Sequence, residues 1–425
     1  MSKSITTRTT RRIPVEELQL GMYVSQLDRP WLETPFLFQG FFVDSDEVLA
    51  KLREHCKSVF VDDKRSEELG NTAPRGLSAQ RHINAPKRDQ VPSKVLTVAA
   101  ETDDDSALLK TEVLTARRAH DTANRVARLL YENIRAGEAI DFDQVSRSLD
   151  PMLDSIMRND DALAWLTRMQ KTDDYVYSHS VASSVWSMVF GKHLGLDRKE
   201  LLVLATGALF IDVGKTRIRH MLLSKPATLT SQEMEEMRAH VDHGVAIVSA
   251  IDGIDPRIVD MVGLHHERHN GTGYPHGLAG ADIPVFARIA GLIDTYDAMI
   301  SERPYAKPRS AYDAARELSR VSGVEFAAEV VEQFIQAIGV FPVGSLVELS
   351  TGEVGMVVAQ NRVRRLRPKL ILLLDRDKLP LDVYPIVDLR NPAFEAPAES
   401  ALWIERGLAP GEYGIDPTEY YLRDF

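Results

Sequence analysis

Residues 265–275 read HHERHNGTGYP, and this stretch decides how the rest of the sequence is interpreted. Two consecutive histidines open it and a glycine-rich turn follows them. A helix gains no packing from adjacent imidazoles, whereas a Gly-x-Gly turn lets the backbone approach a ligand closely. We therefore interpret the stretch as part of a metal or ligand site.

Histidine is concentrated around this stretch. Nine of the 12 histidines lie between His179 and His276, and Asp212 and Asp294 lie in or just after the same segment. Imidazole and carboxylate together suit Zn, Fe, Mn or Ni, and an all-α scaffold can aim such ligands inward from different helices. The segment therefore predicts a metal centre built on helices.

Hydrophobic periodicity predicts the elements around that centre. Apolar residues at three- and four-residue spacing predict helices at 117–135, 142–158, 162–169, 178–194, 198–211, 231–250, 255–266, 285–300, 310–320 and 326–337. After Gly339 the period changes to two, which predicts strands at 346–349, 355–358 and 370–374. The chain thus changes from helical to β structure near residue 339.

These patterns predict a multidomain α+β protein. The expected parts are a small N-terminal α/β domain (9–62), a linker (63–113), a helical connector (114–171), an all-α domain (172–338), a small C-terminal antiparallel β unit (339–390) and an irregular tail (391–425). The 425 residues exceed what one compact core usually holds, and 44% hydrophobic and 27% charged residues are typical of globular proteins.

Composition excludes several classes of protein. The formal charge of −11 argues against a protein that coats nucleic acid. The single cysteine, Cys56, excludes an internal disulfide framework and suits a reducing compartment. The longest apolar run, Leu201–Ile211, is about half the length that a membrane helix needs. With no secretory signal at residues 1–12, we expect a cytoplasmic protein without a membrane span.

The order of the polar residues resembles the HD-GYP family of cyclic di-GMP phosphodiesterases. The resemblance covers roughly residues 172–338. Its second motif, which runs from His265 to the Gly273-Tyr274-Pro275 sequence, is long and specific. It is carried by His179, Asp212-Val213-Gly214-Lys215, His240, the 265–275 stretch, Asp294, Asp297-Ala298 and Arg303-Pro304-Tyr305. Residues 13–24 resemble the small domain that precedes HD-GYP modules in some bacterial proteins. The β unit after Pro342 resembles an appendage found in the same family.

The resemblance implies a site for two divalent metal ions, Fe, Mn, Ni or Zn. One ion would take His179, Asp212 and Asp294, and the other would share Asp212 with His240, His265 and His266. Two cations about 3.5–4 Å apart can activate a water molecule and stabilise both the attacking and the leaving oxygen of an in-line displacement. The reaction implied is hydrolysis of a phosphodiester in cyclic di-GMP.

The resemblance also assigns residues to the substrate. Asp212 and Lys215 would be catalytic, with Lys215 neutralising the attacked phosphate as a point charge. Arg303 would clamp the other phosphate, and the loop Gly273-Tyr274-Pro275 would hold guanine. Lys225 and Lys307 are further candidates for contacts with the nucleotide.

Three positions depart from the family pattern. The histidine of the His-Asp doublet is replaced by Ile211, which cannot coordinate a metal, so the first metal site is weakened. Tyr175 stands where a branch of the family with three metals has a glutamate, so we expect no third metal. Ala306 replaces a basic residue, with Lys307 one position later.

Three hypotheses therefore stay open. The first is a cyclic di-GMP phosphodiesterase, with activity impaired because of Ile211. The second is a catalytically degenerate receptor that binds the nucleotide and signals to a partner, because the loss of one ligand weakens a metal site. The third is an interaction protein that docks on a diguanylate cyclase domain through the GYP loop. A homodimer is compatible with each hypothesis.

Overall fold

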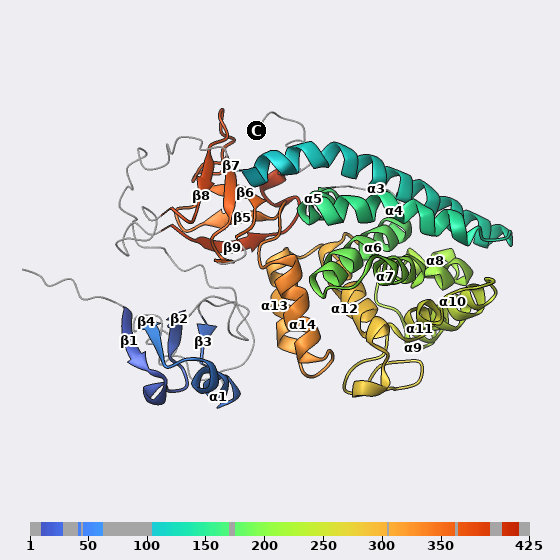
Figure 1. The fold of residues 1–425 in the computed structure, drawn as a ribbon, viewed down its shortest axis with the longest axis horizontal. Helices are drawn as coiled ribbons and strands as arrows, with labels where there is room; N and C mark the ends of the chain where they lie inside the picture. Colours follow the sequence, from blue (N-terminus) through green and yellow to red (C-terminus); the bar gives the residue numbers. More distant parts are fainter. Residues whose placement is uncertain are drawn as a thin grey trace, which may run out of the picture.

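The computed structural model describes residues 10–28, 41–43, 46–62, 104–169, 175–303, 306–361, 364–391 and 402–415. Within these residues the chain forms a small N-terminal domain, a large helical body and a C-terminal sheet (Figure 1). This layout confirms the multidomain α+β class expected from the sequence. None of the described helices is long and apolar enough to cross a bilayer.

The N-terminal domain packs one helix against an antiparallel sheet. Its strands are β1 (Thr10–Pro14), β2 (Tyr23–Leu27), β3 (Phe41–Phe42) and β4 (Ser58–Asp62), in the order β1-β4-β2-β3. Helix α1 (Asp46–His55) buries Leu52 among Val24 and Val59 of the strands. Alternating apolar residues on the strands and one apolar face on the helix thus form a separate small core.

Three helices lead into the large body: α3 (Asp104–Ala136), α4 (Phe142–Arg158) and α5 (Asp160–Met169). Helix α3 begins at Asp104, so the expected end of the linker at residue 113 is wrong, and most of that linker lies outside the described residues. The helix starts with the polar residues Asp104, Asp105 and Ser106, and its first turns were not recognised because the amphipathic pattern appears only further along the sequence.

The helical body carries the candidate site. Its α-helices are α6 (Tyr175–His193), α7 (Arg198–Phe210), α8 (His220–Leu223), α9 (Ser231–Arg238), α10 (His240–Ser249), α11 (Pro256–Leu264), α12 (Val285–Ile300), α13 (Ala311–Val321) and α14 (Ala328–Ile338). Capping boxes start two of them, with Asp197 on α7 and Thr230 on α9. The single helix expected at 231–250 is wrong, because the chain breaks at Ala239 and His240 opens a new helix.

The C-terminal sheet is antiparallel and has five strands among the described residues. They are β5 (Leu346–Leu349), β6 (Val354–Ala359), β7 (Lys369–Leu374), β8 (Ile386–Asp388) and β9 (Ile404–Leu408), in the order β8-β7-β6-β5-β9. Strand β9 corrects the expectation of an irregular tail over residues 391–425. It pairs with β5 from Leu346↔Leu408 to Leu349↔Ile404, which covers an edge that would otherwise be unpaired.

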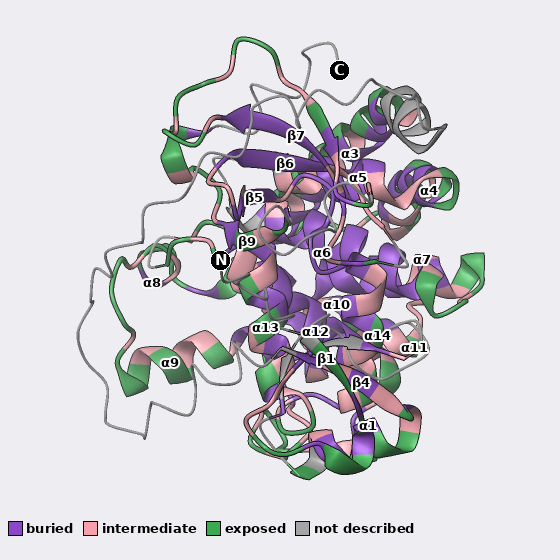
Figure 2. Ribbon diagram, turned by 90° about the vertical axis from the view of Figure 1, so that its left-hand side faces the viewer, coloured by how far each residue is buried: buried purple, intermediate pink, exposed green. Residues whose placement is uncertain are grey.

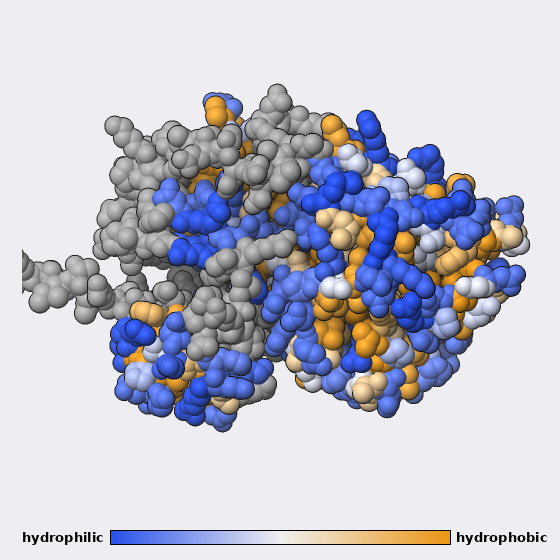
Figure 3. Space-filling model, viewed as in Figure 1, coloured by the Kyte–Doolittle hydropathy of each residue, from blue (hydrophilic) through white to orange (hydrophobic). Residues whose placement is uncertain are grey.

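The helices and the C-terminal sheet share continuous cores, so they are not independent modules. One apolar cluster joins Tyr131 of α3, Leu149 of α4 and Val185 of α6 to Leu346 and Met356 of the sheet. Figure 2 shows β6, β7 and α6 coloured largely as buried, whereas α9 is intermediate to exposed. Figure 3 shows hydrophilic and hydrophobic residues mixed over the visible face of the body. The separate connector and β unit expected from the sequence therefore pack as parts of the helical body.

Candidate metal centre

Two groups of candidate ligands lie together inside the helical body. The first group is His240, His265 and His266, and the second is His179, Asp212 and Asp294. Within each group the ligand atoms lie within 4.8 Å of one another. The structure thus brings together all six residues that the resemblance implied as metal ligands. They come from α6, α10, α12 and the ends of α7 and α11, segments up to 115 residues apart.

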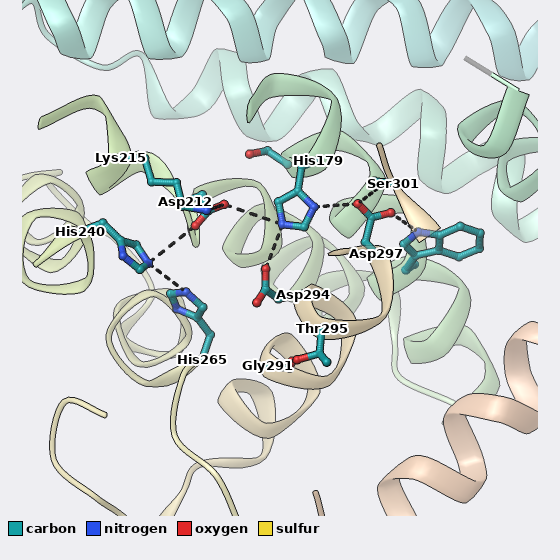
Figure 4. Close-up of polar contacts among 12 residues, drawn as sticks. His179, Asp212, Lys215, His240, His265, Gly291, Asp294, Thr295, Asp297 and Ser301 are labelled. Carbon is teal, nitrogen blue, oxygen red and sulfur yellow. Dashed lines mark hydrogen bonds and ion pairs between the residues drawn. The ribbon is translucent and has the colours of Figure 1, made fainter. Parts of the chain in front are cut away.

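Asp212 stands between the two groups (Figure 4). Its Oδ2 lies 3.7 Å from Nε2 of His179, and its Oδ1 lies 3.7 Å from Nε2 of His240. Among the described residues no donor reaches this buried Oδ1. A buried carboxylate oxygen without a partner is costly, and a cation between Oδ1 and the histidines would compensate it. The donor set therefore fits divalent metal ions that share Asp212.

The backbone orients two of the histidines. Nδ1–H of His240 donates to the carbonyl oxygen of Met237 at 2.7 Å, and Nδ1–H of His265 donates to that of Val262 at 3.0 Å. Each bond fixes the tautomer and leaves Nε2 with a free lone pair. The two Nε2 atoms lie 3.4 Å apart, so both lone pairs serve one position.

Burial keeps the imidazoles of the first group neutral. It lowers the pKa of His240 to about 4, and it also lowers the pKa values of His265 and His266. A metal binds the neutral imidazole, so burial favours the ligand form of all three side chains near neutral pH.

Asp297 supports His179 from behind, a role that sequence reasoning missed. Its Oδ2 lies 2.7 Å from Nδ1 of His179, while Nε2 of the same ring lies 2.9 Å from Oδ1 of Asp294. Burial opposes charge on His179, but its hydrogen bonds to the two carboxylates raise its pKa to about 9. Trp186 Nε1–H donates to Oδ1 of Asp297 at 2.9 Å and fixes it. The available signal was the spacing, since Asp297 lies three residues after Asp294 on one helix.

Lys215 holds Asp212 in its ionised form. The Lys215 ammonium donates to Oδ2 of Asp212 at 2.6 Å, from the short 3-10 helix η4 (Val213–Arg217). Burial opposes ionisation of Asp212, but Lys215 and His179 lower its pKa to about 2. The centre therefore has an ionised carboxylate at its middle at neutral pH.

Two glycines allow the ligand-bearing segments to approach one another. A Cβ at Gly214 would overlap the carbonyl oxygen of His240, and one at Gly291 would overlap the carbonyl oxygen of His265. The first close approach brings η4, and with it Asp212, against α10. The second brings α12, and with it Asp294, against the end of α11. Each contact needs a residue without a side chain.

We expect Gly291→Ala to destabilise the protein by about 1–3 kcal/mol, because the backbone of His265 has to move. The same shift separates Asp294 from the histidines, so metal affinity falls as well. Thermal unfolding and metal titration of the variant check both effects. Gly263→Ala on α11 is the control, because its Cβ would meet only the end of the Val245 side chain at 3.1 Å. Equal stability of the two variants would contradict the prediction.

Ile211 lies in an apolar core. It is fully buried and belongs to a cluster with Ala208 of α7 and Ile289 and Ile293 of α12. The second ligand group therefore consists of one histidine and two aspartates. The side chain of Tyr175, another of the three departures from the family pattern, lies outside the described side chains.

The candidate substrate residues take different positions. Lys215 lies in the centre, whereas Lys225 is paired with Glu233 at 2.6 Å. Arg303 is half-buried and its backbone N–H donates to Ala306 at 3.1 Å. Lys307 is exposed. Pro304 and Tyr305 lie outside the described residues. These roles stay predictions.

The GYP loop folds back on the paired histidines. The Tyr274 ring stacks on His266 with centroids 4.5 Å apart and planes at 20°. A Cβ at Gly273 would overlap Glu267 and Arg268, so the turn needs glycine there. The buried Glu267 carboxylate accepts the backbone N–H groups of His276 at 2.7 Å and Leu278 at 2.9 Å. The loop is thus held by these two hydrogen bonds after Tyr274 and by the close approach of Gly273 before it.

Comparison with known proteins places these features in a family. Residues 151–330 match the HD domain, and residues 10–145 match a domain of unknown function, DUF3391. The chain is 32% identical over 382 residues to the cyclic di-GMP phosphodiesterase PA4108 of Pseudomonas aeruginosa, covering 89% of each protein. The chain belongs to the HD-GYP family. This HD-GYP protein therefore combines an HD domain with the N-terminal domain predicted from residues 13–24.

Other relatives of this HD-GYP protein match shorter parts. The cyclic di-GMP phosphodiesterase of Thermotoga maritima is 39% identical over 126 residues, which is 29% of this chain and 34% of that protein. Among solved structures, the HDG"Y"P protein Bd1817 of Bdellovibrio bacteriovorus has a TM-score of 0.45 at 17% identity, over 76% of this chain and 98% of that one.

Proposed function

We propose that this protein is a metal-dependent phosphodiesterase that hydrolyses cyclic di-GMP. The observation that carries the proposal is Asp212, whose two carboxylate oxygens face different groups of ligands in one buried centre. Membership of the HD-GYP family and the similarity to a cyclic di-GMP phosphodiesterase over 89% of the chain support the same conclusion.

The residues present fit two divalent ions, for which we propose Fe, Mn, Ni or Zn. Asp212 would bridge, His240, His265 and His266 would complete one site, and His179 and Asp294 would complete the other. When bound, such ions supply Lewis acidity and stabilise charge on the attacking and leaving oxygens of a phosphoryl group. Asp297 holds His179 in the orientation that this requires.

The chain also supplies charges for the phosphates. Lys215 lies in the centre and acts as a point charge toward the attacked phosphate. We propose that Arg303, Lys307 and Lys225 contact the rest of the nucleotide and that the GYP loop lies against a guanine. Because Lys225 is paired with Glu233, it contributes only after that pair opens.

A second function, nucleotide reception without turnover, is favoured by one observation. Ile211 is buried among apolar residues and adds no ligand to His179, Asp212 and Asp294. A site with one ligand fewer binds its metal more weakly, and a single resident metal would leave binding without hydrolysis.

Three further proposals concern the compartment, the partner and the oligomeric state of the protein. We propose that the protein works in the cytoplasm, where its single cysteine stays reduced. We propose a diguanylate cyclase domain as a partner at the GYP loop. We also propose that the chain forms a homodimer. Pull-down with a Gly273→Ala variant and measurement of mass in solution test the last two.

The test of the proposed function measures metal content and turnover on one anaerobically purified sample. We expect about two metals per chain and conversion of cyclic di-GMP after loading with Mn or Fe. One metal per chain with nucleotide binding and no product would establish the receptor instead. Absence of both nucleotide binding and product with both metals would contradict the two functions together.

A further inference from the structure

His266 is anchored differently from the other two histidines of its group. His240 and His265 each donate Nδ1–H to a backbone carbonyl. Among the described residues no hydrogen bond reaches the ring of His266, which touches other rings instead. Its neighbours are His265 at 4.1 Å, Tyr274 at 4.5 Å and His240 at 5.0 Å between centroids. The orientation of this ligand therefore depends on stacking.

Tyr274 is the flat partner in that stack. Its plane makes 20° with the plane of His266, whereas the His240 ring stands edge-on at 87°. The backbone N–H of Tyr274 also donates to the carbonyl oxygen of His266 at 3.2 Å. The two residues are thus joined through both backbone and ring.

Arg238 contacts the same tyrosine from another segment. It is the last residue of α9, and its guanidinium carbon lies 4.8 Å from the centroid of the Tyr274 ring. His266 lies flat against the same ring, so Tyr274 contacts both the ligand and the guanidinium. A cation over the face of a tyrosine is attracted by the negative potential of the ring.

We propose that Arg238 is a positioning residue for the metal centre, which presses the Tyr274 ring against His266 and so fixes the third histidine of its group. The inference rests on the proposed function, because it concerns the metal site of that reaction. The inference also gives a role to the break between α9 and α10 at Ala239. The break places Arg238, the last residue of α9, against Tyr274, and it places His240, the first residue of α10, among the candidate ligands.

The arrangement changes what the GYP loop can offer to a nucleotide. The Tyr274 ring is already in contact with His266 and Arg238 within the protein, so a guanine meets the edge or hydroxyl of this ring or the backbone of the loop. A stacking role for Tyr274 with the base would require the ring to leave His266, and metal affinity would then fall as nucleotide binds.

The test measures Mn²⁺ affinity of the full-length, metal-free protein by competition with a chelating dye. We expect Arg238→Met to lower the Mn²⁺ affinity of the site formed by His240, His265 and His266 about two- to fivefold. This is the contribution of a cation–π contact at an exposed position. Arg238→Lys keeps the charge and restores most of the affinity. Tyr274→Leu, which removes the ring, lowers the Mn²⁺ affinity about tenfold or more. Tyr274→Phe, which keeps the ring, binds Mn²⁺ as the unaltered protein does.

Controls separate positioning from folding. Arg320→Met removes an exposed arginine that pairs with Glu317 on α13, and it leaves Mn²⁺ affinity unchanged. Thermal unfolding of the metal-free protein shows that Arg238→Met is folded, with only a small decrease in unfolding temperature, because one exposed contact is lost and the core is unchanged. Unchanged Mn²⁺ affinity in Arg238→Met would overturn the inference, whatever the effect of Tyr274→Leu. A protein that binds Mn²⁺ with these differences and hydrolyses nothing would overturn the proposed hydrolysis alone.

Discussion

Asp212→Asn loses both metal ions and, with them, hydrolysis. The two oxygens of Asp212 face His179 and His240, so one substitution removes a charged donor from both ligand groups. Loss of a group that merely supports a ligand costs 10–100-fold in metal affinity, so we expect at least about a hundredfold loss at each site. Metal titration and a turnover assay on the same sample check this result.

Asp242→Asn is the matched control, because Asp242 is an exposed aspartate on α10 two residues from His240. It should keep both metals and full turnover. The metal-free forms of the two variants are compared by thermal unfolding to show that both are folded. Two metals per chain in folded Asp212→Asn would refute the shared role of this carboxylate.

Ile211→His produces the opposite change, a higher metal affinity of the group formed by His179, Asp212 and Asp294. The imidazole adds a ligand directly before Asp212, and we expect more than about tenfold higher affinity together with faster turnover. Without metal, a polar ring replaces an aliphatic chain in a fully buried position, which costs about 1–3 kcal/mol. The stabilisation gained on adding metal is therefore larger than in the unaltered protein. Thermal unfolding with and without metal measures it.

Ile211→Gln separates the two effects. It places a polar group of similar size in the same core and supplies a poor ligand, so it should share the loss of stability without the gain in affinity. Ile211→His with unchanged metal affinity would mean that α7 and α12 hold position 211 too far from the metal, among Ile289 and Ile293.

The candidate ligands could be identified from the sequence, because the ability to coordinate a metal is a property of the single side chain. Histidines next to one another, Asp212 in its short motif and the glycines of residues 265–275 cannot be explained by helical packing. Helix positions followed from apolar spacing, as for α12, which was expected and found at 285–300. The break at Ala239 was not visible, since both flanking segments have helical spacing.

Long-range contacts were decided only by the tertiary structure. Strand β9 has apolar residues only at its two ends, and its pairing with β5 becomes favourable once that edge exists. Asp297 acquires its role because Trp186 and His179, more than a hundred residues earlier in the chain, converge on its two oxygens.

The sequence by itself determined which atoms can bind a metal and that position 211 cannot. The tertiary structure decided which candidate ligands lie together, that Asp212 lies between the two groups, and that Tyr274 stacks on His266 while Arg238 contacts Tyr274. The physical reason is the distance along the chain over which each property is decided. Coordinating ability belongs to a single side chain, whereas the orientation and burial that make it a ligand come from packing between distant segments.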